Sequence, residues 1–165
     1  MTNDSNRNSF EEPLAVNRQY KDRLFRFIFR DKASLLQLYN AINGTDYQDP
    51  DALEVNTIEN AVYMSMKNDL SFLIYSILNL YEHQSTWNPN MPLRNLLYIS
   101  DLLKRYITQK KLDLYSSRLI KLPTPQAIVF YNGTKEEPER QVLRLSDSYE
   151  VSGKEGCLEL STVVL

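Results

Sequence analysis

Two apolar runs in the middle of the chain, separated by a single residue, constrain the fold more than any other feature. The first is DLSFLIY (69–75) and the second is ILNLYEHQ (77–84). Both contain the aromatic and β-branched residues that strands favour, so they predict two neighbouring strands, most simply a hairpin. The join near Ser76 lacks an Asn-Gly or Asp-Gly pair, so the sequence leaves the geometry of the turn open.

Ahead of these runs the sequence predicts a polar arm, two helices and a short strand. Residues 1–16 are rich in polar residues and are expected to form a mobile arm. Apolar residues at helical spacing predict a first helix from Arg18 to about Phe29. Asp31 can cap a second helix, and Gly44 stands where a helix ends in a left-handed residue. Alternation of apolar and polar residues predicts a strand over 53–57.

The second half of the chain predicts a long helix followed by strands. Pro92 suits the first turn of a helix, and apolar residues from Leu93 and Leu97 to Tyr106 give that helix an apolar face. Residues 126–131 are almost wholly apolar and predict a central strand. Asn132-Gly133 is a hairpin signal, which makes 142–145 the return strand. Residues 157–165 predict a last strand whose abrupt end suggests that a longer protein continues beyond it.

Composition limits the classes of function. The chain has 165 residues, enough for one domain over 17–165 with a real core, and 42% of them are hydrophobic. The net charge of −2 provides no overall positive field, so nucleic-acid binding would need a local basic face. A single cysteine, Cys157, excludes an intrachain disulfide and is expected in the core. No signal peptide or membrane-spanning run is visible, which makes the cytoplasm the expected compartment.

Aromatic residues before and within the first apolar runs are expected in the core and not on base-stacking surfaces. They are Tyr20, Phe25, Phe27, Phe29, Phe72 and Tyr75.

Acidic residues flank the two central runs. Asp69 precedes the first predicted strand, and Glu82 and Gln84 lie near the end of the second. Alternate side chains of a strand share a face, so Glu82 and Gln84 project together while His83 points away, where a structural role is favoured. If the two strands pair, Asp69 can approach Glu82 and form an oxygen-rich site suited to Mg²⁺ or Mn²⁺. The ordinary alternative is that these acids simply face solvent.

The stretch NDLSFLIYSILNLYEHQSTWNPNMPLRNLLYISDL (68–102) resembles the recombination-promoting nucleases, an Rpn-type, transposase-like family of the PD-(D/E)XK nuclease superfamily. KDRLFRFIF (21–29), NTIENAVYMSMKND (56–69) and LPTPQAIVFYNG (122–133) resemble the same family in the same order. The resemblance implies an α/β, restriction-endonuclease-like fold with a mixed central sheet flanked by helices. It also implies a Mg²⁺-dependent DNA endonuclease linked to recombination or mobile elements.

The resemblance assigns roles to particular residues. It makes Asp69 and Glu82 the metal ligands and puts Gln84 in the place of the Lys of the usual E-x-K. Lys would supply a fixed charge, whereas Gln can orient a water only through hydrogen bonds. Asp22 lies on the segment that resembles the superfamily's acidic helix and can add a carboxylate, although a solvated role explains it equally well.

Basic residues of the long helix are candidates for DNA contact. Arg94 and Tyr98 lie four residues apart and share a helix face, where they could bind a phosphate. Arg94 could instead pair with Glu82 and hold the site together. Further along the helix, a basic set could follow the DNA backbone or simply be solvated: Lys104, Arg105, Lys110 and Lys111.

No helix-turn-helix or zinc-finger motif is visible, so low sequence specificity is expected. The rival hypothesis is a degenerate nuclease-fold module that binds DNA or a protein partner without cutting, and a homodimer stays open in either case.

Overall fold

One mixed sheet forms the centre of the molecule. The computed structural model describes residues 27–29, 31–55, 70–151, 153–154 and 156–165. Within them the strands are β1 (Glu54–Val55), β2 (Leu70–Ile74), β3 (Ile77–Gln84), β4 (Thr124–Tyr131), β5 (Gln141–Arg144) and β6 (Ser161–Val164). In this described part they form one six-stranded sheet in the order β1-β2-β3-β4-β6-β5.

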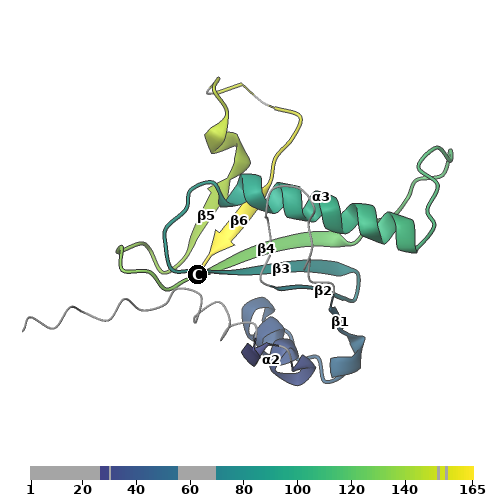
Figure 1. The fold of residues 1–165 in the computed structure, drawn as a ribbon, viewed down its shortest axis with the longest axis horizontal. Helices are drawn as coiled ribbons and strands as arrows, with labels where there is room; N and C mark the ends of the chain where they lie inside the picture. The colour runs from purple at the N-terminus through teal and green to yellow at the C-terminus, as the bar shows by residue number, and fades with distance from the viewer. Residues whose placement is uncertain (1–26, 30, 56–69, 152, 155) are drawn as a thin grey trace, which may run out of the picture.

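Helices cover both faces of the sheet. Helix α2 (Lys32–Asn43) lies on one face and helix α3 (Met91–Gln109) on the other (Figure 1). Two short 3-10 helices, η1 (Pro50–Ala52) and η2 (Leu145–Ser148), lie in the connections. The predicted α/β class with a mixed central sheet between helices is confirmed at this level.

The paired apolar runs form the expected hairpin. Strands β2 and β3 pair antiparallel from Leu70↔Tyr81 to Ile74↔Ile77, which leaves Tyr75 and Ser76 as a two-residue turn. Both have positive φ, 45° and 66°, as the central residues of a type I′ turn do. The chain therefore makes this turn without the Asn-Gly pair that usually favours it. The Tyr75 ring lies 4.6 Å from that of Tyr47, centroid to centroid, and this contact supports the strained position.

Ser76→Gly is expected to raise the free energy of unfolding by about 0.5–1 kcal/mol. Glycine removes the Cβ that disfavours positive φ, and the Ser76 side chain is exposed, so its removal costs little packing. Urea unfolding followed by circular dichroism measures the change. Tyr75→Gly is the matched comparison and should gain less, because it also removes the ring contact with Tyr47. Loss of stability in Ser76→Gly would contradict the strain argument.

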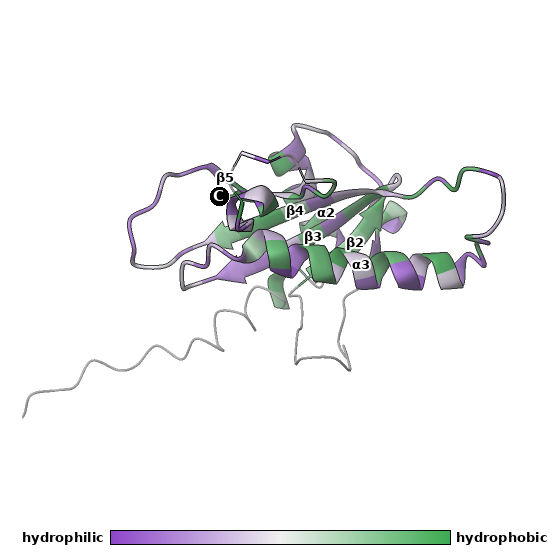
Figure 2. Cartoon of the chain, turned by 90° about the horizontal axis from the view of Figure 1, so that it is seen from above, coloured by the Kyte–Doolittle hydropathy of each residue, from purple (hydrophilic) through white to green (hydrophobic). Residues whose placement is uncertain are grey.

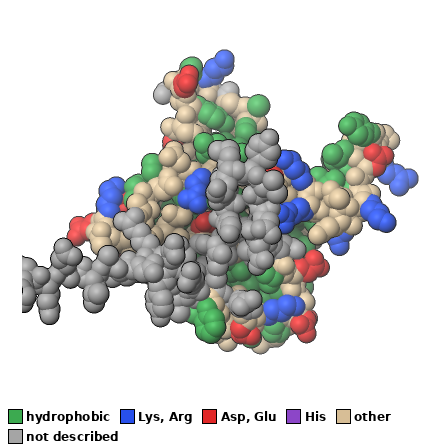
Figure 3. Space-filling model, viewed as in Figure 1, with side chains coloured by type: hydrophobic (Ala, Val, Ile, Leu, Met, Phe, Trp, Pro, Cys, Tyr) green, Lys and Arg blue, Asp and Glu red, His purple; other side chains and the backbone are tan. Residues whose placement is uncertain are grey.

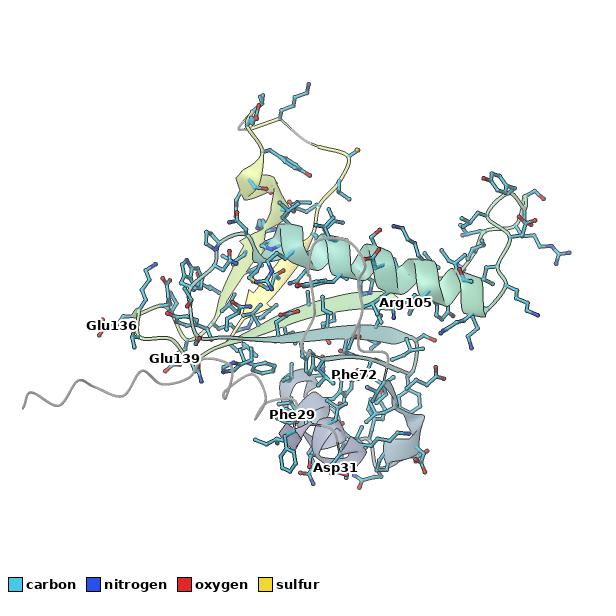
Figure 4. All side chains as sticks on the ribbon, in the orientation of Figure 1. Phe29, Asp31, Phe72, Arg105, Glu136 and Glu139 are labelled. Carbon is cyan, nitrogen blue, oxygen red and sulfur yellow. The ribbon has the colours of Figure 1, made fainter. Side chains whose placement is uncertain are left out.

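The core has a layer on each side of the sheet. On the α2 side lies Phe72, which is fully buried and is labelled in Figure 4. Its ring meets those of Tyr39 and Tyr81 edge-on. On the α3 side, a second cluster consists of Leu78, Leu80, Tyr98, Ile99, Leu102 and Ala127. The central strands carry many hydrophobic residues, whereas α3 alternates between apolar and polar residues (Figure 2). Successive side chains of β3 lie in different layers, because Leu80 packs on the α3 side and Tyr81 on the α2 side.

The helix ends follow the local signals of the sequence. The Asp31 side chain accepts a hydrogen bond from the Ser34 backbone N–H at 2.9 Å, and this bond lowers the pKa of Asp31. Gly44 ends α2 in a left-handed conformation, φ 64°. Pro92 lies in the first turn of α3. The predicted caps and the predicted start of the long helix are confirmed.

The predicted hairpin at Asn132-Gly133 is wrong. Strand β5 does not return along β4; instead β6 lies between them, parallel to β4 and antiparallel to β5. A turn signal is local and says nothing about a later segment that competes for the same strand edge. Gly133 has another reason to be glycine, because an added Cβ would lie 2.6 Å from the Ser85 carbonyl oxygen.

Several burial predictions are also wrong. Exposed side chains that were expected in the core or on the apolar helix face are Phe27, Tyr75, Leu93, Leu97 and Cys157. Along α3, Asn95 and Tyr98 take the buried positions near the helix start instead. The last strand begins only at Ser161, so Cys157 precedes it. Of the first predicted helix, residues 27 and 28 are helical and 18–26 lie outside the described residues, as do 1–16 and Thr57.

No helix in the described part of the chain combines the length and the apolar character that crossing a bilayer requires.

Candidate active site at the end of β3

Glu82 is a buried carboxylate near the carboxyl end of β3. It is only 2% exposed, and it lies on the α3 side of the sheet because Leu78 and Leu80, its alternate neighbours, pack in the α3 layer. Gln84 follows on the same side and is half-buried, while His83 lies on the opposite side. The predicted grouping of Glu82 with Gln84, and the separation of His83 from them, are confirmed. Burial of an acid at this depth requires a compensating partner.

Arg94, in the first turns of α3, reaches that carboxylate. Its Nη2 lies 3.8 Å from Glu82 Oε2, and the Arg94 side chain is 30% exposed. The same Nη2 donates a hydrogen bond to Tyr98 Oη at 3.1 Å. The guanidinium carbon also lies 5.8 Å from the centre of the Tyr98 ring. The structure therefore brings Glu82, Arg94 and Tyr98 together, with a positive group that offsets part of the cost of burying the acid.

Two contacts hold Arg94 in this position. Its Nη1 donates to Met91 Sδ at 3.4 Å. The next residue, Asn95, donates from Nδ2 to Thr162 Oγ1 of β6 at 2.9 Å, and both of these side chains are fully buried. Sequence reasoning missed Met91, Asn95 and Thr162. The spacing of positions 91, 94, 95 and 98, which places them on one helix face, was the available signal for Met91 and Asn95. Thr162 lies on β6, and helical spacing gives no signal for it.

The end of β3 is joined closely to the end of β4. The two strands run parallel with Gln84 paired to Tyr131, and the Asn132 backbone N–H donates to the Gln84 carbonyl oxygen at 3.1 Å. The Gly133 position approaches Ser85, as described above. The backbone that carries Glu82 and Gln84 is therefore fixed by β4 up to the last residue of β3.

Two predicted acids, Asp69 and Asp22, lie outside the described residues. Among the residues that the structure does describe, no group of three or more His, Cys, Asp or Glu side chains could hold a metal ion. Asp69 and Asp22 are not among those residues, so this absence does not bear on a metal site that contains them.

The predicted basic set lies farther along α3. Lys104, Arg105 and Lys110 are exposed, and Lys111 follows them with a left-handed φ of 51°. Lys104 Nζ lies 3.4 Å from Asp101 Oδ1. All four of these side chains are exposed to solvent.

Replacing Arg94 distinguishes its two suggested roles, which are pairing with Glu82 and contact with a DNA phosphate. Arg94→Met is expected to lower the free energy of unfolding by about 1–2 kcal/mol, because it removes a cation that lies beside the buried Glu82. Partial exposure of Arg94 keeps the loss below that of a fully buried pair. Arg94→Lys should recover part of the stability. Thermal unfolding measures both variants, with Arg140→Met, an exposed arginine in the β4–β5 loop, as the matched control. Unchanged stability together with weaker DNA binding would instead make Arg94 a phosphate contact only.

Comparisons of the chain with protein-family models, with curated proteins and with solved structures found no match.

Proposed function

We propose that the chain is a metal-dependent DNA endonuclease of the PD-(D/E)XK type with low sequence specificity, linked to recombination or mobile elements. The observation that carries the proposal is the placement of Glu82, a carboxylate 2% exposed at a strand end, with Gln84 on the same side and Arg94 3.8 Å away. A carboxylate is the kind of hard oxygen ligand that Mg²⁺ or Mn²⁺ prefers. The mixed sheet with a helix on each face supports a restriction-endonuclease-like fold.

Connectivity supports Asp69 as the second ligand. Leu70 is the first residue of β2 and pairs with Tyr81, the residue before Glu82. Asp69 is bonded to Leu70, and adjacent Cα atoms are about 3.8 Å apart whatever the backbone angles. If the antiparallel register continues by one residue, Asp69 stands opposite Glu82, close enough for the two carboxylates to share one ion.

Each side chain has a task in phosphodiester hydrolysis. Asp69 and Glu82 would hold the ion, which when bound would polarise the phosphate and lower the pKa of a water. The resulting hydroxide would attack phosphorus as the bond to the leaving sugar oxygen breaks. Gln84 would orient that water through its amide but supplies no charge. Arg94, held by Tyr98, balances the charge of Glu82 before substrate arrives. The negative charge that develops on the phosphate would therefore be stabilised mainly by the ion and only weakly by the protein's own cations.

Plasmid nicking tests the proposal. Supercoiled DNA is incubated with the wild type and with Asp69→Ala, each with Mg²⁺, with Mn²⁺ and with a chelator. Nicking by the wild type alone, only with metal and at many positions, supports a nuclease of low specificity. Equal nicking by both proteins points to a contaminant and overturns the assignment.

A second candidate, a nuclease-fold module that binds DNA or a protein partner without cutting, is favoured by two observations. Gln84 stands where the usual E-x-K of the nuclease superfamily has a Lys, and Arg94 already lies beside the carboxylate that would bind the ion. DNA binding without nicking in either metal would select this module. Neither binding nor nicking would select a protein-interaction domain.

A further inference from the structure

The connection between α3 and β4 projects beyond the end of the sheet in both ribbon views (Figures 1 and 2). This segment, residues 110–123, is termed the basic arm. Its tip carries large apolar side chains in solvent: Leu114 is 64% exposed, Tyr115 99% and Leu119 81%. Apolar groups gathered on a projecting loop are the usual mark of a contact surface.

The basic arm has its own hydrogen-bonded structure. The Asp113 side chain accepts from the Tyr115 backbone N–H at 2.9 Å, and the Asp113 carbonyl oxygen accepts from the Ser116 N–H at 3.2 Å. At its far end Pro123 is buried, and the Thr124 N–H donates to the Ser76 carbonyl oxygen at 2.8 Å. The turn at Asp113 thus presents the Tyr115 ring outward, and a partner would find it already positioned.

Positive charge surrounds this tip. From residue 104 to residue 121 there are six cations and one acid, Asp113, a net charge of +5 in a chain whose total is −2. All six cations are exposed: Lys104, Arg105, Lys110, Lys111, Arg118 and Lys121. Lys and Arg side chains lie at the base of the projecting loop and along α3, where Arg105 is labelled (Figures 3 and 4). Such a strip in an otherwise acidic protein complements a phosphate backbone.

We propose that the basic arm binds DNA at a junction between duplex and single strand, with its cations on the phosphates and Tyr115 stacked on an unpaired base. The proposal rests on the proposed function, since DNA is the substrate there. Stacking on an aromatic ring is available to any base once it is unpaired, which fits an enzyme without sequence preference. The cations extend from the arm onto the last turns of α3, at Lys104 and Arg105, as a nucleic-acid backbone requires and a membrane-inserting tip does not.

The length of α3 sets the position of the junction. Arg94 and Lys110 are 16 residues apart, which is about 24 Å along a helix, or about seven nucleotide steps of a DNA strand. Because Tyr115 lies beyond Lys110, the preferred cleavage position is at least about seven nucleotides from the junction, if the strand follows the helix from the arm to Glu82.

The first test measures binding without metal, so that cleavage plays no part. Fluorescence anisotropy compares a blunt duplex with a duplex that carries a single-stranded tail. Tyr115→Ser is expected to weaken binding of the tailed DNA by about tenfold and of the blunt DNA much less, while Tyr115→Phe keeps the wild-type affinity because it keeps the ring. Equal weakening of both DNAs, or no weakening, overturns the stacking role.

The second test uses a matched pair of charge variants. Arg118→Gln/Lys121→Gln lies in the basic arm, and Arg140→Gln/Lys154→Gln removes two exposed cations elsewhere, so both have the same net charge. The arm variant is expected to lower the slope of log affinity against log salt by about 1.5, whereas the control leaves it unchanged. Equal effects of the two variants would show bulk charge alone and overturn the arm as a site.

The outcomes separate this inference from the nuclease itself. If the wild type does not nick DNA but binds tailed duplex through the basic arm, the proposed nuclease activity is wrong and the proposed DNA site on the arm stands. If the wild type nicks DNA and the arm variants bind and cut as it does, only the proposed DNA site on the basic arm is overturned. A last experiment measures binding to vesicles of phosphatidylserine and phosphatidylcholine. Binding to these vesicles that depends on Tyr115, without DNA binding that depends on Tyr115, overturns the proposal in favour of a membrane contact.

Discussion

Glu82→Gln is expected to reduce the rate of metal-dependent plasmid nicking on the order of a thousandfold. The substitution keeps the shape of a side chain that is 2% exposed but removes the charge that would hold the ion. Stability should change little, because the neutral amide is cheaper to bury and offsets the loss of attraction to Arg94. Single-turnover nicking over a range of Mn²⁺ concentrations measures the rate, and thermal unfolding checks that the variant is folded.

Two further variants make this result specific. Asp69→Asn should cause a loss of the same order if the two carboxylates share an ion. Glu139→Gln, an exposed acid in the β4–β5 loop labelled in Figure 4, should nick at the wild-type rate. Wild-type nicking by a folded Glu82→Gln protein would remove the basis of the proposed function.

Gln84→Lys is expected to raise the nicking rate by about tenfold to a hundredfold. Gln84 lies on the same side of β3 as Glu82, half-buried at the strand end, where an ammonium group could stabilise charge that develops on the phosphate. Rates at saturating Mg²⁺ provide the comparison, since a change in metal affinity then has little weight.

Gln84→Met is the matched control, because it has similar length but neither charge nor amide. It should cut more slowly than the wild type if the amide orients a water. A Lys variant that is no faster than the wild type would contradict a site built on the E-x-K pattern.

Local signals predicted much of the fold. Asp31 and Gly44 mark the ends of α2 because a cap depends only on neighbouring backbone groups. The runs at 69–75 and 77–84 predicted β2 and β3, since their composition suits a buried sheet. Alternation along β3 then separated His83 from Glu82 and Gln84, and helical spacing joined Arg94 to Tyr98.

The errors involve partners that are distant in the sequence. Asn132-Gly133 suggested a hairpin, but the edge of β4 is taken by β6, a strand from much later in the chain. Leu93 and Leu97 appeared to belong to the apolar face of α3, yet Asn95 is buried there because Thr162 offers it a hydrogen-bond partner. Neither β6 nor Thr162 can be assigned to its neighbour by periodicity, which reports only on the segment itself.

The position of β6 also bears on the order in which the molecule assembles and opens. Strand β5 precedes β6 in the chain but joins the sheet only through it, so the two should dock onto β4 as one late, cooperative unit. Their amide protons should then exchange with deuterium together, at a lower free energy of opening than those of β3. Each such opening withdraws Thr162 from Asn95, the residue after Arg94. An opening of β5 and β6 would therefore also loosen the start of α3, which holds Arg94 beside Glu82.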